Sequence, residues 1–158
     1  MTLKMASTVR IEDVIKQREF RSEAHKAMVN LIYTSSQILT KISEVTESFG
    51  ITRQQYNVLR ILRGQYPGAA SINEIKDRML DRMSDCSRLA DRLAAKSLIT
   101  KSHCASDKRS VDITITNEGL DLLERMEPAV SSIESVFSSF SQGEVNRFND
   151  MLDRLRQD

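Results

Sequence analysis

Residues 84–98 read Ser-Asp-Cys-Ser-Arg-Leu-Ala-Asp-Arg-Leu-Ala-Ala-Lys-Ser-Leu, and this stretch decides the fold of the chain. Its apolar side chains recur at steps of three and four, the period that gives a helix one buried face. They are Cys86, Leu89, Ala90, Leu93 and Ala94. Ser84 is placed to cap the N-terminus, because its hydroxyl can accept from a free backbone N–H of the first turn. The stretch therefore predicts an amphipathic helix.

The polar face of this helix has two interpretations. It carries Asp85, Ser87, Arg88, Asp91 and Arg92. Short hydroxyls and an arginine near a helix N-terminus suit entry into a DNA major groove, where Arg matches the two acceptors of guanine. A solvated face on an ordinary surface helix has the same residue types. The neighbouring segments favour the first interpretation.

A second, shorter helix is expected just before this stretch. Ser71 and Glu74 form a capping box, in which each side chain satisfies a free N–H near the other. The helix should run from Ile75 to about Leu80, and a turn follows it at residues 81–82. We expect its inward positions to be Ile72, Ile75, Met79 and also Met83. Two helices joined in this way form a helix-turn-helix, a pattern that ordinary helical hairpins share.

A β-hairpin is expected directly after the helix of residues 84–98. Residues 98–103 and 111–116 alternate apolar and polar side chains, which is the period of a strand. The polar tip between them contains Asp107, Lys108 and Arg109. A hairpin in this position is a wing, and its basic tip can follow the DNA backbone or insert Arg into a narrow minor groove.

Long amphipathic helices flank this module. Apolar residues from Phe20 to Phe49 recur at three, four and seven, which predicts a helix of roughly 28 residues and about 42 Å. We expect a second copy of the chain to cover part of its apolar stripe, although a helix bridging two parts of one monomer has the same pattern. Gly50 should end this helix in a left-handed conformation. Thr52 and Gln55 form another capping box, which opens a helix that ends near Gly64.

The C-terminal part returns to helix after a predicted cap at Thr116. Pro128 predicts a kink or break near Glu127. Ser141 and Glu144 form a third capping box before a last helix. The predicted fold is mainly α with a small β-hairpin wing. Its parts are an N-terminal arm and long dimerisation helix (1–50), a winged helix-turn-helix (51–116) and C-terminal helices that complete the dimerisation region (117–158).

Charge is unevenly distributed along the chain. The formal net charge is only +1, but residues 51–116 hold 12 Lys and Arg against 7 Asp and Glu, and the flanks hold 11 against 15. A basic middle between acidic ends suits a module that touches phosphates. No apolar run is long enough for a transmembrane helix, and no secretory signal is present, so we expect a cytoplasmic protein. Two cysteines give no disulfide framework, which favours a reduced compartment.

The sequence resembles the MarR family of bacterial transcription regulators. The recognition helix matches at Ser87-Arg88-Leu89-x-Asp91-Arg92-Leu93-x-x-Lys96-x-Leu98-Ile99, and the wing matches at Asp107-Lys108-Arg109. Two further matches are Ile51-Thr52-x-x-Gln55-x-x-x-Leu59 and Ile115-Thr116-x-x-Gly119-x-x-Leu122.

The resemblance implies a homodimer that binds double-stranded DNA at a pseudo-palindromic operator, usually as a repressor, and that a small-molecule effector releases. It places four residues toward the major groove: Ser84, Asp85, Ser87 and Arg88. It places Arg109 in the minor groove and assigns Asp107 to positioning the wing. We expect Arg92 to touch the DNA backbone and Lys108 to help hold the wing on DNA.

Three positions depart from the family pattern. Ser97 replaces the glycine common in Lys-Gly-Leu, so a left-handed backbone would be strained there. Asp85 puts a negative charge where the family usually has a neutral residue; it would repel phosphate, or accept from a cytosine amine. Lys108 replaces an arginine and loses its bidentate fork.

Other kinds of site have little support in the sequence. Cys86 is expected to be a buried apolar residue, whereas Cys104 beside the wing could be exposed and oxidisable. His103 and Cys104 are adjacent on a strand and point to opposite faces, so we expect no metal site. We find no catalytic motif and expect neither an enzyme nor a cofactor. The alternative to a DNA-binding regulator is a winged-helix protein-interaction module without useful DNA binding, motivated by Asp85 and the near-neutral net charge.

Overall fold

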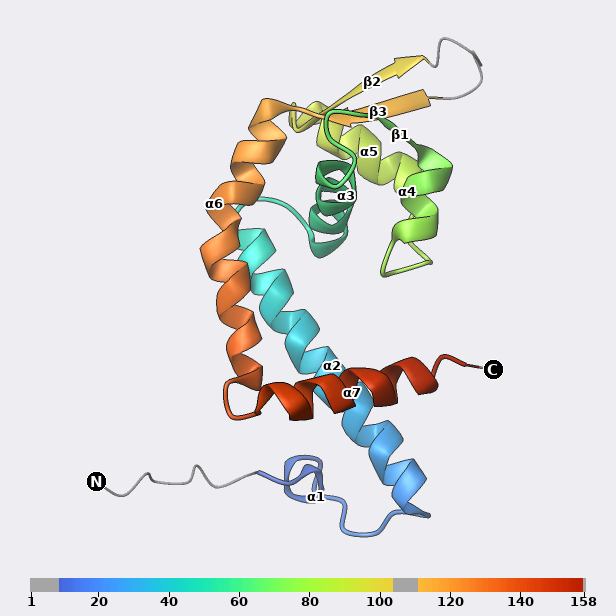
Figure 1. Cartoon of the computed structure of the whole chain (residues 1–158), viewed down its shortest axis with the longest axis vertical. Coiled ribbons are helices and arrows are strands. Elements are labelled where there is room, and N and C mark those ends of the chain that lie inside the picture. Colours follow the sequence, from blue (N-terminus) through green and yellow to red (C-terminus); the bar gives the residue numbers. More distant parts are fainter. Residues whose placement is uncertain (1–8, 104–110, 158) are drawn as a thin grey trace, which may run out of the picture. The chain divides into compact units, whose positions relative to one another are not determined.

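The computed structural model describes residues 9–103 and 111–157 and is mainly helical (Figure 1). It separates into two units, Met1–Thr40 and Lys41–Asp158, and helix α2 passes from one to the other. The bounds of the elements are α1 Ile11–Val14, α2 Glu23–Ser48, α3 Arg53–Arg63, β1 Ala70–Ser71, α4 Ile72–Arg78, α5 Cys86–Ala95, β2 Ile99–His103, β3 Val111–Ile115, α6 Asn117–Ile133, the 3₁₀ helix η1 Glu134–Phe137 and α7 Gln142–Arg154. The prediction of a mainly helical chain with a small hairpin is confirmed.

The first unit consists of α1 and the N-terminal part of α2. Glu12 of α1 forms an ion pair with Lys26 of α2, and the Lys26 ammonium lies 5.9 Å from the centre of the Phe20 ring. These contacts hold the short helix against the start of the long one. The apolar stripe of α2 is largely exposed in the single chain. Its large exposed side chains are Met28, Leu31, Ile32 and Leu39.

Helix α3 is the centre of the second unit. It contacts α4, α5, α6 and β3, and Val58, Leu59 and Leu62 on it are fully buried. The capping box of Thr52 and Gln55 starts α3 as predicted, and Gly50 before it has a φ of +76°. Side chains from the other elements complete this core, which explains why α4 and α5 sit at fixed positions on α3. They are Ile75, Ala90, Leu93, Ile113, Leu123 and Met126.

A three-stranded antiparallel sheet, in the order β1-β3-β2, lies beside the helices. Ile99 of β2 pairs with Ile115 of β3, and Ala70 of β1 pairs with Ile113 of β3. The hairpin of β2 and β3 is the predicted wing. The third strand was not predicted, because two residues are too short to show an alternating pattern.

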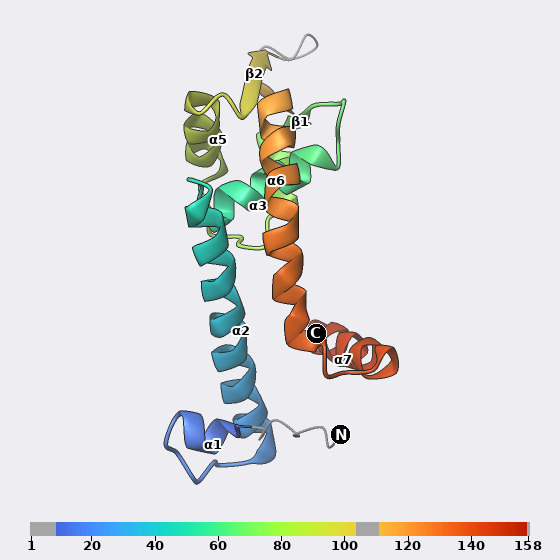
Figure 2. The ribbon, with the colours of Figure 1, turned by 90° about the vertical axis from the view of Figure 1, so that its left-hand side faces the viewer.

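Helix α6 begins beside the sheet and leads to α7 (Figure 2). Thr116 caps α6 as predicted, and its hydroxyl accepts from the Gly119 N–H at 3.1 Å. Of the kink or break predicted near Glu127, the break is wrong, because α6 continues through Pro128 to Ile133. The capping box of Ser141 and Glu144 starts α7 as predicted. Large apolar side chains at and along α7 are exposed, namely Phe140, Phe148, Met151 and Leu155.

Candidate nucleic-acid interface

Helix α5 has one buried and one exposed face, as the sequence predicted. Cys86, Ala90 and Leu93 are buried in the core. The outward positions are all exposed: Asp85, Ser87, Arg88, Asp91 and Arg92. The core thus fixes the position of the helix, while its polar face keeps free hydroxyl and guanidinium donors. Such donors can bind base edges or phosphates.

The N-terminus of α5 is capped by Asp85 and not by Ser84, so that prediction is wrong. Asp85 Oδ1 accepts from the Arg88 N–H at 3.1 Å, and Asp85 Oδ2 lies 3.8 Å from Arg88 Nε. The Ser84 hydroxyl is buried and has no hydrogen-bond partner among the described residues. The carboxylate of Asp85 therefore serves the helix, where the positive end of the helix dipole stabilises it. The Arg88 side chain remains 80% exposed.

The turn between α4 and α5 is held from two sides. Asn57 on α3 accepts from the Leu80 N–H at 2.9 Å, and Asp81 accepts from the Met83 N–H at 3.1 Å. The side chains of Leu80 and Met83 point into solvent, with exposed fractions of 91% and 93%. The inward position predicted for Met83 is wrong, because the backbone leaves the helical conformation at Met79, where φ is −65° and ψ is 135°.

Two lysines connect α5 to its neighbours through contacts that were not predicted. Lys101 on β2 forms an ion pair with Asp91 on α5. Lys96 at the end of α5 donates to the Gly50 carbonyl at 2.8 Å, beside the end of α2. No spacing rule reveals either contact, because each joins residues that are distant in sequence or on different types of element. Ser97 follows with a φ of +59°, so the predicted left-handed backbone is confirmed.

The tip of the wing lies outside the described residues. This applies to Asp107, Lys108 and Arg109, and to Cys104. Their roles stay predictions. The described part of the wing keeps full register from Ile99 opposite Ile115 to His103 opposite Val111. The strands therefore fix the base from which the tip extends.

Other chemistry has little support among the residues that the structure describes. Cys86 is buried, as predicted, and burial raises the pKa of its thiol, which disfavours the reactive thiolate. Within residues 9–103 and 111–157 no group of His, Cys, Asp and Glu has the arrangement of a metal site. In these same ranges no helix has the length and apolar character needed to span a membrane.

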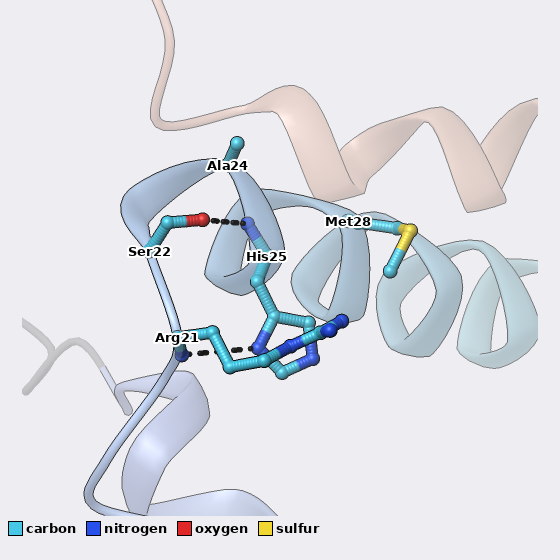
Figure 3. A pocket seen from close by; sticks show the side chains of 5 residues that line it. All are labelled: Arg21, Ser22, Ala24, His25 and Met28. Carbon is cyan, nitrogen blue, oxygen red and sulfur yellow. Dashed lines mark hydrogen bonds between the residues drawn. The ribbon is translucent and has the colours of Figure 1, made fainter.

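An open hollow of about 370 Å³ lies at the start of α2 (Figure 3). Arg21, Ser22, Ala24, His25 and Met28 line it. His25 Nδ1 accepts from the Arg21 N–H at 3.3 Å, and the Ser22 hydroxyl accepts from the His25 N–H at 3.1 Å. These local bonds cap the first turn of the helix. His25 is thus engaged in local structure and is partly exposed.

The comparisons with known proteins agree with this geometry. The model of the MarR family matches residues 51–111, which cover α3, α4, α5 and β2. The repressor MdtR of Bacillus subtilis is 32% identical over 103 residues, which is 65% of this chain and also 65% of that relative. The aligned part therefore spans just under two thirds of the relative.

Solved structures extend the likeness in fold over most of the chain. The structure of Bordetella bronchiseptica BpsR, from work on regulation of its DNA binding by 6-hydroxynicotinic acid, has a TM-score of 0.72 at 24% identity and covers 84% of this chain and 99% of BpsR. The S. aureus MepR–DNA complex has a TM-score of 0.74 at 23% identity and covers 87% of this chain and 97% of MepR. The capped helix on α3, the wing and these comparisons agree: the chain resembles the MarR family in sequence over residues 51–111 and shares the fold of the solved structures over most of its length.

Proposed function

We propose that this protein is a sequence-specific DNA-binding transcription regulator that acts as a homodimer, with α5 in the major groove and the wing on the adjacent backbone. One observation supports this most strongly. The face of α5 opposite the core is exposed and carries Ser87, Arg88 and Arg92 beside a capped N-terminus. N-terminal residues of a recognition helix are those that reach base edges. Residues 51–116 would form the DNA-binding module.

Dimerisation is supported by apolar surface on both units. The stripe of α2 includes Met28 at 51% and Ile32 at 61% exposure, and α7 leaves Met151 and Leu155 at 56% and 70%. Exposed apolar side chains on amphipathic helices are stabilised when a second copy covers them. A two-fold dimer presents two copies of α5, which suits a pseudo-palindromic operator with half-sites about 34–36 Å apart.

The names of the relatives support the direction of regulation. MdtR is a repressor, and 6-hydroxynicotinic acid regulates DNA binding by BpsR. We therefore propose repression that a small organic effector relieves, by a regulator that is not an enzyme. The relatives are bacterial, so the site of action would be the cytoplasm, where a bacterial chromosome lies.

The experiment is a fluorescence-anisotropy titration against the DNA upstream of the protein's own gene, at two salt concentrations, beside a scrambled duplex. If the duplex fails, an operator is selected in vitro from random duplexes. We expect tight, sequence-dependent binding that weakens with salt, because each neutralised phosphate releases counterions. Binding no tighter than to random DNA after selection would refute the proposal.

A variant pair makes this test specific to α5. Arg88→Ala should weaken binding to the operator, by roughly 1–3 kcal/mol if Arg88 reads a base. Arg125→Ala removes the same charge from the exposed face of α6 and serves as the control. Equal effects of the two substitutions would contradict the role of α5.

A further inference from the structure

The turn that precedes α5 presents apolar side chains in an unusual place. Leu80 and Met83 are 91% and 93% exposed, more than the other large apolar side chains for which exposure is described. They lie within four residues of each other, directly before the Asp85 cap. Single exposed apolar residues are ordinary on protein surfaces, so exposure alone carries no argument. What distinguishes Leu80 and Met83 is their position directly before the candidate DNA-reading helix.

The conformation of this turn is fixed before any ligand binds. The Leu80 N–H is bound by Asn57 from the core helix α3, and the Met83 N–H is bound by Asp81 within the turn. Both side chains are therefore held outward by bonds of their own backbone. When a side chain on an already ordered backbone makes a contact, little backbone conformational entropy is lost.

We propose that Met83 is a specificity-determining residue that selects thymine in the operator by apolar contact with its C5 methyl group. The inference rests on the proposed function, because it requires α5 to enter the major groove. Thymine is the base that displays a methyl group there, and apolar side chains recognise it. Met83 stands two residues before the N-cap of α5, whereas Leu80 directly follows the end of α4. Methionine is flexible and polarisable, so it can adapt to a small apolar group.

The surroundings favour DNA over a protein partner. Arg82 lies within the turn, between Leu80 and Met83, and Arg88 lies in the first turn of α5; both are exposed. The nearby carboxylates are engaged, since Asp81 accepts from the Met83 N–H and Asp85 caps α5. Two apolar side chains with an arginine between them form a patch far smaller than the roughly 800 Å² per partner of a stable protein interface. One methyl group of a base matches a single side chain in size.

The test removes the methyl group without changing the base pairing. Each thymine of the selected operator is replaced in turn by deoxyuridine, symmetrically in both half-sites, and affinity is measured for the full-length protein. We expect one position at which the wild type loses about fourfold in affinity per half-site, the value for one buried methyl group. Met83→Ala should bind the thymine operator as weakly as the wild type binds the deoxyuridine operator, and should no longer distinguish the two.

Leu80→Ala is the matched control, because it removes an equally exposed apolar side chain from the same turn. It should keep the discrimination between thymine and deoxyuridine. Circular dichroism and thermal unfolding should show both variants folded. If Met83→Ala keeps the discrimination, if Leu80→Ala loses it equally, or if no thymine is sensitive, the inference is overturned while the regulator function stands. An unchanged operator affinity of Met83→Ala also overturns it. Failure of the wild type to bind any selected duplex overturns both the inference and the proposed function.

Discussion

Gly119 marks the tightest contact between α6 and the sheet, and replacing it with alanine should destabilise the protein. A Cβ atom at this position would lie 2.4 Å from the Leu98 carbonyl oxygen and 2.7 Å from Ile115 Cγ1. Ordinary contacts of a Cβ begin at 3.4 Å, so the backbone must move by about 1 Å. The same Leu98 carbonyl accepts from the Thr116 N–H at 3.1 Å, which anchors the start of α6.

The magnitude follows from three contributions. Overpacking costs roughly 1–3 kcal/mol. A weakened hydrogen bond from Thr116 to Leu98 costs about 0.5–1.5 kcal/mol. Alanine returns about 1 kcal/mol through its higher helix propensity. We therefore expect Gly119→Ala to lower the free energy of unfolding by roughly 0.5–3.5 kcal/mol, or Tm by roughly 1–14 °C for a chain of this size.

Gly143→Ala is the matched control for this prediction. Gly143 lies in the first turn of α7, and a Cβ atom there meets no atom within 4 Å. The substitution should leave stability unchanged or raise it by up to about 1 kcal/mol. Both variants are measured by urea unfolding at one protein concentration, because a dimer's stability depends on concentration. A Gly119→Ala protein as stable as the wild type would refute the reasoning from close approach.

Three further predictions use other features of the chain. Ser97→Gly should raise the urea midpoint. Removing the strain of a left-handed serine stabilises the folded state by about 1–2 kcal/mol, whereas the greater freedom of glycine in the unfolded chain costs about 0.5–1 kcal/mol. An unchanged or lower midpoint would argue against strain. Hydrogen bonds from the Ser71 backbone and hydroxyl lower the pKa of Glu74 below its usual value of 4.5, so this carboxylate stabilises the fold above about pH 4.5 and loses that effect as pH falls through its lower folded pKa. Glu74→Gln keeps the capping geometry without the charge, so the stability gap to the wild type should close as pH falls below 4.5, and a gap independent of pH would exclude this cause. Arg109→Ala should weaken operator binding by roughly 1–3 kcal/mol without loss of fold, and an unchanged affinity would remove Arg109 from the interface.

Features set by a few adjacent residues were predicted from the sequence. Three capping boxes and the cap at Thr116 depend on contacts between residues three apart, so the local sequence contains all the information they need. The left-handed Gly50 was also found, since it stands where a helix must end, and the left-handed Ser97 was found because the family pattern has a glycine there. For the candidate site, the recurrence of apolar residues at steps of three and four correctly predicted which side of α5 is buried.

Features that depend on tertiary contacts were not predicted. Ser84 and Asp85 are both good caps by residue type, so the local sequence did not show that Asp85 occupies the N-cap position. Met83 points outward because the chain leaves the helical conformation at Met79, which shifts the periodicity that predicted an inward side chain. The ion pair of Lys101 with Asp91 joins a strand to a helix, so no single period contains it.

The division of α5 into two faces also has a consequence for how such a protein can evolve. Cys86, Ala90 and Leu93 hold the helix in place, while the outward side chains contribute little to the core. Exposed substitutions usually change stability by less than about 0.5 kcal/mol, a small fraction of the 5–15 kcal/mol that keeps a domain folded. Under the proposed function, mutations at Ser87 or Arg88 would change which DNA sequences are bound while the protein stays folded at each step. The residues proposed to bind DNA and those that stabilise the fold lie on opposite faces of one helix. After gene duplication, one copy could therefore change its DNA targets by single substitutions.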